Sequence, residues 1–252
     1  MSAAGSGHPG GSLSCVEILV QLYYRTMRIR PDEPLWPDRD RFVLSKGHAG
    51  PALYSVLARR GFFDPAELAS LRKLDSRLQG HPDARRLPGL DCSTGSLGQG
   101  FSAAVGLAAG LGLQGSGSRV YCLLGDGELQ EGCVWESAAT ASQRHLRNIV
   151  AIVDSNGLQL DGPVSTIKSI EPLALRWQSH GWHAVEADGH DFGSLDAALT
   201  EASSAARPAV VIARTIKGRG VSFMEGVADW HGRCPTPDES DRAAREIRER
   251  LQ

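Results

Sequence analysis

Two short polar segments carry side chains that can bind a metal ion and a phosphate. One is Gly-Asp-Gly at 125–127 and the other is Asp-Ser-Asn at 154–156, and each ends a run of apolar residues. Mg²⁺ takes hard oxygen ligands and usually shares them with substrate phosphates, so the Asp126 carboxylate and the Asn156 amide oxygen can complete a shell begun by a diphosphate. Gly127 has no Cβ and allows the backbone to approach the phosphate. The pair indicates a cradle for a divalent cation and a diphosphate.

A Gly-Asp-Gly segment alone is more often an ordinary turn than a binding site. Here the spaced asparagine and the two preceding runs favour the binding interpretation, because open α/β sheets bind ligands beyond the carboxyl ends of their strands. A helix-like stretch at 133–145 follows the first segment. A bound anion is therefore expected near a helix N-terminus.

Continuous apolar runs predict the strands that must position these segments. Such runs, rather than alternating patterns, are typical of parallel sheets covered on both faces. They alternate with helical patterns, which predicts an α/β fold with a mainly parallel sheet and helices on both faces. The predicted strands are Phe42–Leu44, Val120–Leu124, Ile149–Val153, His183–Glu186 and Ala209–Ala213, and the predicted helices are Leu13–Met27, Ala49–Arg60, Pro65–Leu74, Gly98–Gly112, Glu131–His145, Pro172–His180 and Leu195–Ala206.

Two long Gly- and Pro-rich connections, 75–97 and 217–238, are interpreted as active-site loops because structureless loops of this length are usually functional. The charged segment 237–252 predicts a C-terminal amphipathic helix. The segment at 98–103 matches the dinucleotide pattern GxGxxA, but that motif must follow a strand. We expect its glycines to allow close helix packing instead.

Four of the eight histidines lie in segments rich in Gly and Pro, where loops concentrate functional residues. An imidazole titrates near neutrality and can move protons at a reacting oxygen. An isolated histidine is more often structural, so the interpretation depends on these neighbours. The four are His8, His48, His81 and His231, whereas His145, His180, His183 and His190 are expected at the surface.

Length and charge narrow the class of protein. The chain of 252 residues can bury a sizeable core as one domain. Its formal net charge of −2 offers no electrostatic reason to expect nucleic acid or an anionic membrane as a partner. The five cysteines are odd in number, form no CxxC pair and lie mostly in apolar surroundings, which predicts buried free thiols and a cytoplasmic protein. We find no apolar stretch long enough for a membrane span.

Six ordered motifs together resemble the transketolase family along nearly the whole chain. GDGELQEG at 125–132, followed by IVDSNGLQLDG at 152–162, resembles the thiamine diphosphate motif. The other five are SGHPGG at 6–11, DRFVLSKGHA at 40–49, GHP at 80–82, STGSLGQG at 93–100 and WHG at 230–232.

The resemblance implies roles for particular residues. The metal, Mg²⁺ or another divalent cation such as Ca²⁺ or Mn²⁺, would be held by Asp126, Asn156 and the Leu158 carbonyl. Thiamine diphosphate would contact Gly127 and, through the Ser-Thr-Gly-Ser-Leu segment, Gly95, Ser96 and Leu97. His8 and His231 would protonate or deprotonate sugar oxygens, His81 would bind the donor's terminal hydroxyl, and His48 and His231 would lie near the diphosphate. Glu131 is interpreted either as a link to the partner's cofactor-activating glutamate or as an acid favoured by the helix macrodipole.

The resemblance also implies that this chain is one part of a larger enzyme. Transketolases normally carry a diphosphate-binding, a pyrimidine-binding and a C-terminal domain, and only the first is expected here, over 1–252. The activating glutamate would come from the pyrimidine domain of another chain. We therefore expect the N-terminal subunit of a split transketolase that moves a two-carbon ketol unit from a ketose phosphate to an aldose phosphate, with two copies of each chain. The alternatives are another thiamine diphosphate enzyme component, such as a deoxyxylulose-phosphate synthase or a ketoacid dehydrogenase, and a non-catalytic partner-binding half.

Overall fold

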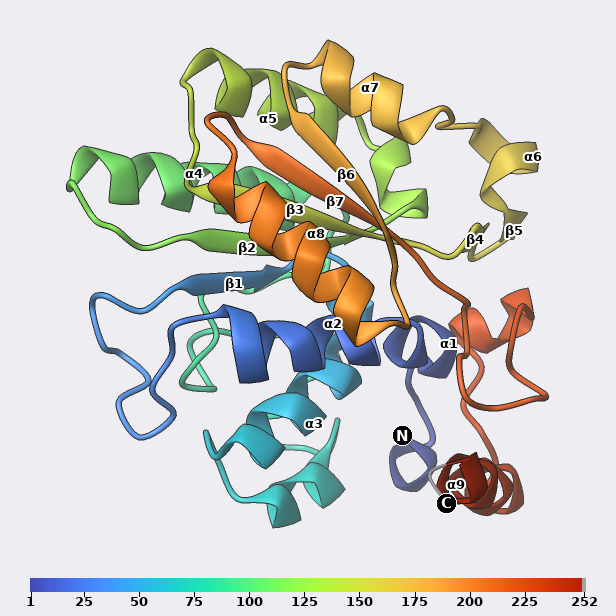
Figure 1. Ribbon diagram of the computed structural model, residues 1–252. Coiled ribbons are helices and arrows are strands. Elements are labelled where there is room, and N and C mark those ends of the chain that lie inside the picture. The colour runs from blue at the N-terminus through green and yellow to red at the C-terminus, as the bar shows by residue number, and fades with distance from the viewer. Residues whose placement is uncertain (251–252) are drawn as a thin grey trace.

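The computed structural model describes residues 1–250 and is built on a five-stranded parallel sheet (Figure 1). The strand order is β1-β2-β3-β7-β6, and every neighbouring pair is parallel. The fold class and the parallel sheet predicted from the apolar runs are confirmed. The strands are β1 Arg41–Leu44, β2 Val120–Gly125, β3 Ile149–Ser155, β6 His183–Asp188 and β7 Ala209–Arg214, and a small hairpin pairs β4 Leu158–Gln159 with β5 Gly162–Pro163.

Helices cover both faces of the sheet. Figure 1 shows α4, α5 and α7 on one face and α2 and α8 on the other, with α3 packed beyond α2. The α-helices are α1 Pro9–Leu13, α2 Val16–Gln21, α3 Gly50–Arg60, α4 Gln99–Leu113, α5 Gly132–Gln143, α6 Val164–Lys168, α7 Leu173–Ser179, α8 Phe192–Ser204 and α9 Pro237–Arg250. Short 3₁₀ turns lie at η1 Ser2–Ala4, η3 Gly47–Ala49, η4 Pro65–Ser70, η5 Gly127–Gln130 and η6 Ala228–His231, and α2 continues into the π-helical turn η2 Leu22–Thr26.

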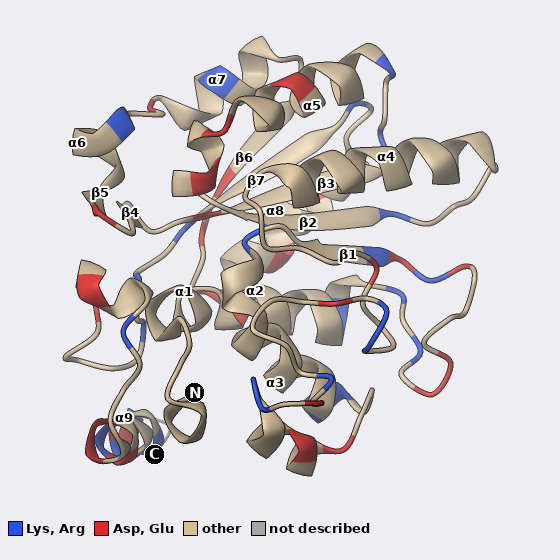
Figure 2. Cartoon of the chain, turned by 180° about the vertical axis from the view of Figure 1, so that it is seen from behind, with Lys and Arg blue, Asp and Glu red and all other residues tan. Residues whose placement is uncertain are grey.

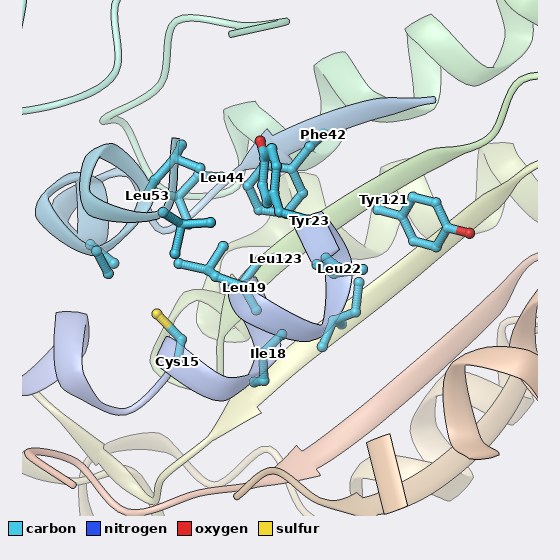
Figure 3. Packing of buried hydrophobic residues seen from close by; sticks show 14 of the residues in the cluster. Cys15, Ile18, Leu19, Leu22, Tyr23, Phe42, Leu44, Leu53, Tyr121 and Leu123 are labelled. Atoms are coloured by element: carbon cyan, nitrogen blue, oxygen red, sulfur yellow. The ribbon is translucent and has the colours of Figure 1, made fainter. Parts of the chain in front are cut away.

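Successive strand residues enter two different hydrophobic cores. Tyr121 and Leu123 of β2 pack with α2, α3 and α8, whereas Val120, Cys122 and Leu124 pack with α4, α5 and α7. Figure 3 shows the first of these cores, where side chains of α2 meet those of β1 and β2. Because side chains alternate across a strand, an unbroken apolar run is what a sheet buried on both faces requires.

The predicted helix at 13–27 is the clearest difference between the sequence patterns and the structure. Only Leu13 of this range lies in α1, and the helical structure resumes at Val16 as α2 and ends with η2 at Thr26. The Ser14 hydroxyl donates to the Gly11 carbonyl at 3.2 Å, a local bond of the kind that competes with helical geometry, and to the buried Asp154 carboxylate at 2.6 Å. The predicted helix at 65–74 is also only the 3₁₀ turn η4, which ends before Leu71.

The thiol prediction is partly wrong. All five cysteines are free, but only Cys15 and Cys122 are buried. The terminal helix is confirmed as far as Arg250, and residues 251 and 252 lie outside the described part of the chain. Acidic and basic residues are interspersed over the outer elements (Figure 2). Within residues 1–250, no helix is long and apolar enough to cross a membrane.

Candidate active site

The carboxyl ends of the central strands bring the predicted metal segments together. The register pairs Gly125 of β2 with Asp154 of β3, and the Asp126 amide donates to the Asp154 carbonyl at 3.2 Å. Loops that follow β1, β2, β3 and β7 therefore meet at one edge of the sheet. They enclose a cavity of about 260 Å³ lined by Gly11, Lys46, His48, Leu97, Gly125, Asp126, Gly127, Glu128, Gln130, Glu131, Asn156, Leu158, Gln159, Leu160, Asp161, Lys217 and His231.

Asp126 is a buried carboxylate held by backbone amides. It is 3% exposed and accepts hydrogen bonds from the amides of Gly127 at 2.8 Å and Gly157 at 2.5 Å. Within residues 1–250, no lysine or arginine nitrogen lies within 4 Å of it. Burial, with a contribution from the negative charge of Asp154, raises the pKa of Asp126 to about 6. A bound divalent cation would supply the missing positive charge.

Asn156 is oriented by its neighbours. Its amide nitrogen donates to Asp154 at 3.3 Å, and its amide oxygen accepts from the Leu158 backbone amide at 3.1 Å. The amide oxygen is thereby turned away from Asp154, on the side of β4. One carboxylate, one amide oxygen and one backbone carbonyl form an all-oxygen set that fits Mg²⁺ or Ca²⁺. The described residues contain no cluster of three or more His, Cys, Asp or Glu side chains that could hold a metal.

Two buried lysines bring positive charge to the cavity. Lys46 is 1% exposed in its side chain and forms an ion pair with Asp154. Lys217 is 2% exposed, and the structure places no carboxylate within 4 Å of its ammonium group among residues 1–250. Burial and the charge of Lys46 lower the pKa of Lys217 to about 8. An unpaired buried cation facing a cavity fits an anionic ligand such as a diphosphate.

Glu128 joins three segments beneath the cavity. Its carboxylate accepts from the Ser45 hydroxyl, from the Gly98 amide at 2.8 Å and from the Gly125 amide at 3.1 Å. These donors belong to the loop after β1, the start of α4 and the end of β2. Burial raises the pKa of Glu128, and the three hydrogen bonds compensate for the lost solvation.

The four motif histidines form one cluster. The ring centroid of His8 lies 5.4 Å from that of His48, 5.7 Å from that of His231 and 6.2 Å from that of His81. The rings of His48 and His231 are 4.9 Å apart. Their segments are far apart in the sequence, and only the fold brings the rings together, with His48 and His231 lining the cavity.

These imidazoles are held in the neutral form. Burial and nearby cations lower the pKa of His8 to about 4 and that of His231 to about 3. The pKa of His48 lies well below its usual value for the same reasons, and burial and the charge of Arg72 lower that of His81. At neutral pH each ring therefore offers one N–H donor and one lone pair.

The structure places the remaining candidates around the cavity in different ways. Leu97 lines it, and a Cβ built on Gly95 would lie 3.4 Å from the His81 ring. Ser96 is exposed and does not line the cavity. Glu131 is exposed at the cavity rim, where it is the N-cap residue of α5 without a capping bond from its side chain. This position is compatible with both interpretations of Glu131.

The segment at 98–103 behaves as a packing motif. No strand precedes it in the described loop 71–97. A Cβ on Gly100 would lie 2.7 Å from the Ser45 Cα, and one on Gly98 would lie 2.4 Å from the Cys133 sulfur. These glycines allow α4 to approach the loop after β1 and the start of α5, as expected.

Among the other histidines, His190 differs from its prediction. Its side chain is only 9% exposed, with Nδ1 3.2 Å from a Glu17 carboxylate oxygen and Nε2 accepting from the Ile216 amide at 2.8 Å. It links the loop after β6 to α2 and to the connection that follows β7. His145 is exposed and His180 and His183 are partly exposed.

Sequence reasoning missed several charged residues of the site. The structure adds Asp154, Glu128 and Lys217 to the site, and Asp154 and Glu128 belong to the two motif segments at the ends of β3 and β2. Lys46 stands beside a motif histidine, which was the available signal. Nothing in the sequence marks Lys217 as buried, or marks Lys217 or Arg72 as a neighbour of a histidine.

Comparisons with known proteins match one family along nearly the whole chain. A model of the family described as transketolase, thiamine diphosphate binding domain matches residues 1–248. The chain is 46% identical over 228 residues to the 6-deoxy-6-sulfo-D-fructose transketolase subunit SqwG of Clostridium sp. (strain MSTE9), covering 90% of this chain and 83% of that protein. It is 39% identical to one subunit of the apulose-4-phosphate transketolase of Phocaeicola vulgatus, covering 99% of this chain and 89% of that protein.

A solved structure is similar over nearly the whole chain. The transketolase of Campylobacter jejuni superposes with a TM-score of 0.91 and 35% identity, covering 97% of this chain. The match spans only 40% of that longer enzyme, and the same share of longer curated transketolases.

Proposed function

The chain belongs to the transketolase family through its thiamine diphosphate-binding domain, and we propose that it is the N-terminal subunit of a split transketolase. Three observations support the proposal. The chain spans most of the length of two relatives named as transketolase subunits. The cavity joins an unpaired buried carboxylate to an unpaired buried lysine. Four neutral histidines lie beside it.

We propose that the cavity holds the diphosphate of thiamine diphosphate with Mg²⁺ or another divalent cation. Asp126, Asn156 and the Leu158 carbonyl would hold the metal. Lys217 would neutralise charge on the diphosphate, and Gly127 and His48 would contact it as uncharged groups. Gly95, Ser96 and Leu97 would contact the rings of the cofactor. When bound, thiamine diphosphate supplies the carbanion that ketol transfer requires. The chain's own residues supply binding, orientation and hydrogen bonds.

The histidine cluster would handle the sugar. Neutral imidazoles can donate to an alkoxide or accept from a hydroxyl without a large change in local charge. His8 and His231 would act on oxygens at the bond that forms or breaks, and His81 would bind the donor's terminal hydroxyl. Glu131 at the rim would face the partner chain, where it could contact the cofactor-activating glutamate.

Catalysis would require a second polypeptide. Within residues 1–250, the only carboxylates lining the cavity are Asp126, Glu128, Glu131 and Asp161. Asp126 is assigned to the metal, Glu128 is fully bonded beneath the cavity, and Glu131 and Asp161 lie at its rim. We propose that the partner supplies the activating glutamate and the pyrimidine and C-terminal domains, with two copies of each chain in a cytoplasmic complex. The donor is proposed to be a ketose with a terminal anion, because the two subunit relatives are named for a sulfo sugar and a sugar phosphate.

Reconstitution tests this function. The chain and its partner are assayed for ketol transfer separately and mixed, with thiamine diphosphate and Mg²⁺. We expect activity only in the mixture, and loss of that activity when Asp126→Asn replaces the wild-type chain. Robust transfer by this chain alone would refute the split-enzyme proposal. Efficient use of pyruvate as the donor would favour another class of thiamine diphosphate enzyme.

A further inference from the structure

Arg72 lies between two of the histidine segments and belongs to neither. It follows η4 and has a φ of 59°, in the left-handed region, while its backbone amide donates to the Leu78 carbonyl at 2.9 Å. Its guanidinium donates to the Ser6 hydroxyl at 2.6 Å and to the Gly80 carbonyl at 3.3 Å. Arg72 therefore joins the segment that carries His8 to the segment that carries His81.

The space around this guanidinium is closely fitted. A Cβ added to Gly80 would lie 3.0 Å from the Arg72 Cζ atom. A side chain at that position would displace the guanidinium by a few tenths of an ångström. The glycine of the GHP motif therefore leaves room for Arg72 in its observed position.

Arg72 has no acidic partner. Among residues 1–250, no carboxylate oxygen lies within 4 Å of its guanidinium, and its Nε is buried without a hydrogen-bond partner. A cation held only by neutral acceptors gains little for stability compared with a paired one. The position of Arg72 is better explained by its effect on a third neighbour, which it contacts in addition to Ser6 and Gly80.

That contact is the His8 ring. Arg72 Nη2 lies 3.4 Å from His8 Nδ1. A guanidinium donates hydrogen bonds and never accepts them, so a hydrogen bond at this contact uses the Nδ1 lone pair and leaves the ring proton on Nε2. Among the described residues Nε2 has no hydrogen-bond partner, which leaves it free for a ligand. A parallel contact occurs at His231, where Lys217 Nζ lies 2.9 Å from Nδ1.

We propose that Arg72 is a positioning residue that holds His8 as a neutral imidazole with its proton on Nε2, so that His8 meets the substrate as a hydrogen-bond donor. The identity of the acceptor, an oxygen of the sugar, rests on the proposed function. The tautomer of His8 is inferred from the contact with Arg72 and does not depend on that function. In this tautomer Nε2 has no lone pair, so His8 stabilises a developing alkoxide and does not act as a base through that atom.

The surroundings of His8 favour the same state. The charged and titratable groups that face it are Arg72 and His81 from the loop after η4, His48 from η3, and Lys217 and His231 from the connection after β7. Burial has the largest influence on its pKa, and the charge of Arg72 comes next. Loss of that charge should therefore raise the pKa without returning it to the value of an exposed histidine.

Nuclear magnetic resonance on the full chain can observe the tautomer directly. Long-range ¹H–¹⁵N spectra of histidine-labelled protein are recorded from pH 3 to pH 8, a range that spans the pKa of about 4 of His8, and His8 is assigned with an H8Q variant. We expect the Nε2–H pattern in the wild type. In Arg72→Met we expect a mixture of tautomers and a titration midpoint higher by about one pH unit, since a nearby like charge has this order of effect.

Two further variants keep the test decisive. Arg77 lies in the same loop, pairs with Glu67 and contacts no histidine. Arg77→Met should therefore leave the His8 signals unchanged. Arg72→Lys keeps the charge and a donor and should retain the Nε2–H pattern; it is the variant to interpret if R72M does not fold.

A wild-type Nδ1–H pattern, an R72M spectrum identical to that of the wild type, or an Nδ1–H pattern in R72K would overturn the proposal. Because the spectra need neither partner nor cofactor, they remain informative if no ketol transfer is found.

Discussion

Replacement of Lys217 by methionine should have opposite effects on stability and on ligand binding. The ammonium group is buried beside the cavity and contacts the neutral ring of His231, at 2.9 Å from Nδ1. In the ligand-free chain this charge is a cost, because it has lost its hydration without gaining a counter-ion. With a diphosphate bound, the same charge becomes a direct contribution to affinity.

The magnitude follows from the pKa of Lys217, which falls from 10.5 to about 8. A decrease of this size corresponds to roughly 3 kcal/mol of destabilisation at pH 7, at about 1.4 kcal/mol per pH unit. K217M loses the donor to His231, which costs about 1–2 kcal/mol, so the ligand-free variant should be more stable by about 1–2 kcal/mol. Loss of a charge-assisted hydrogen bond to phosphate, worth about 1.5–3 kcal/mol, should weaken thiamine diphosphate binding by roughly 10- to 150-fold.

The sign of the pH dependence is fixed. The folded-state pKa of Lys217 lies below the unfolded value, so between about pH 8 and 10.5 the unfolded chain binds more protons. The destabilisation is therefore complete below about pH 8 and is relieved as the pH rises to 10.5. The advantage of K217M over the wild type should disappear across this range.

Urea denaturation at several pH values gives the free energy of unfolding, and calorimetry of the assembled complex gives cofactor affinity. Lys73→Met, at an exposed lysine, is the matched control and should change neither quantity appreciably. A K217M chain that is less stable than the wild type at pH 7 without ligand, or that binds thiamine diphosphate equally well, would refute the reasoning.

Three further variants probe other contacts of the site. Asp126→Asn should reduce metal-dependent thiamine diphosphate binding at least 100-fold by calorimetry, and unchanged binding would exclude Asp126 as a metal ligand. The folded-state pKa of Asp126 is raised, so the ligand-free wild type should lose stability as the pH rises from 3.8 through about 6. The Asp126→Asn variant should not show this loss. Lys46→Met leaves Asp154 buried and unpaired and should cost about 3–5 kcal/mol in urea denaturation, with substantial recovery in K46M/D154N; a cost under 1 kcal/mol would argue against the ion pair. Gly98→Ala places a Cβ 2.4 Å from the Cys133 sulfur at a φ of 78° and should lower the free energy of unfolding by about 2–3 kcal/mol. The double variant G98A/C133A should recover the part of this loss that is due to the clash. If it recovers nothing, the whole loss comes from the backbone conformation.

Some features of the site were predictable because their signals are local. An apolar run followed by a polar turn marks the carboxyl end of a buried strand, and this placed Asp126 and Asn156 at one edge of the sheet. The four histidines were recognised from their Gly- and Pro-rich neighbours. The family resemblance supplied what the residues alone did not, namely the cofactor and the partner chain.

Other features depend on contacts between distant segments, which a single sequence does not reveal. The helical pattern continues through Ser14 and Cys15, yet the helix is divided where Ser14 reaches a carboxylate 140 positions away. Arg72 and Lys217 look like ordinary surface cations until the fold brings each against the Nδ1 of a histidine. Contact between a cation and a distant histidine is a tertiary property, and here it distinguishes these two residues from surface cations.

A crystal structure of the assembled complex with thiamine diphosphate and Mn²⁺ in place of Mg²⁺ would test the central claim most directly, because anomalous scattering locates the metal. The account predicts the metal at about 2.2 Å from oxygens of Asp126 and Asn156, with the diphosphate within hydrogen-bond distance of Lys217. A metal bound away from these two side chains, or a diphosphate outside the cavity at the ends of β2 and β3, would contradict it.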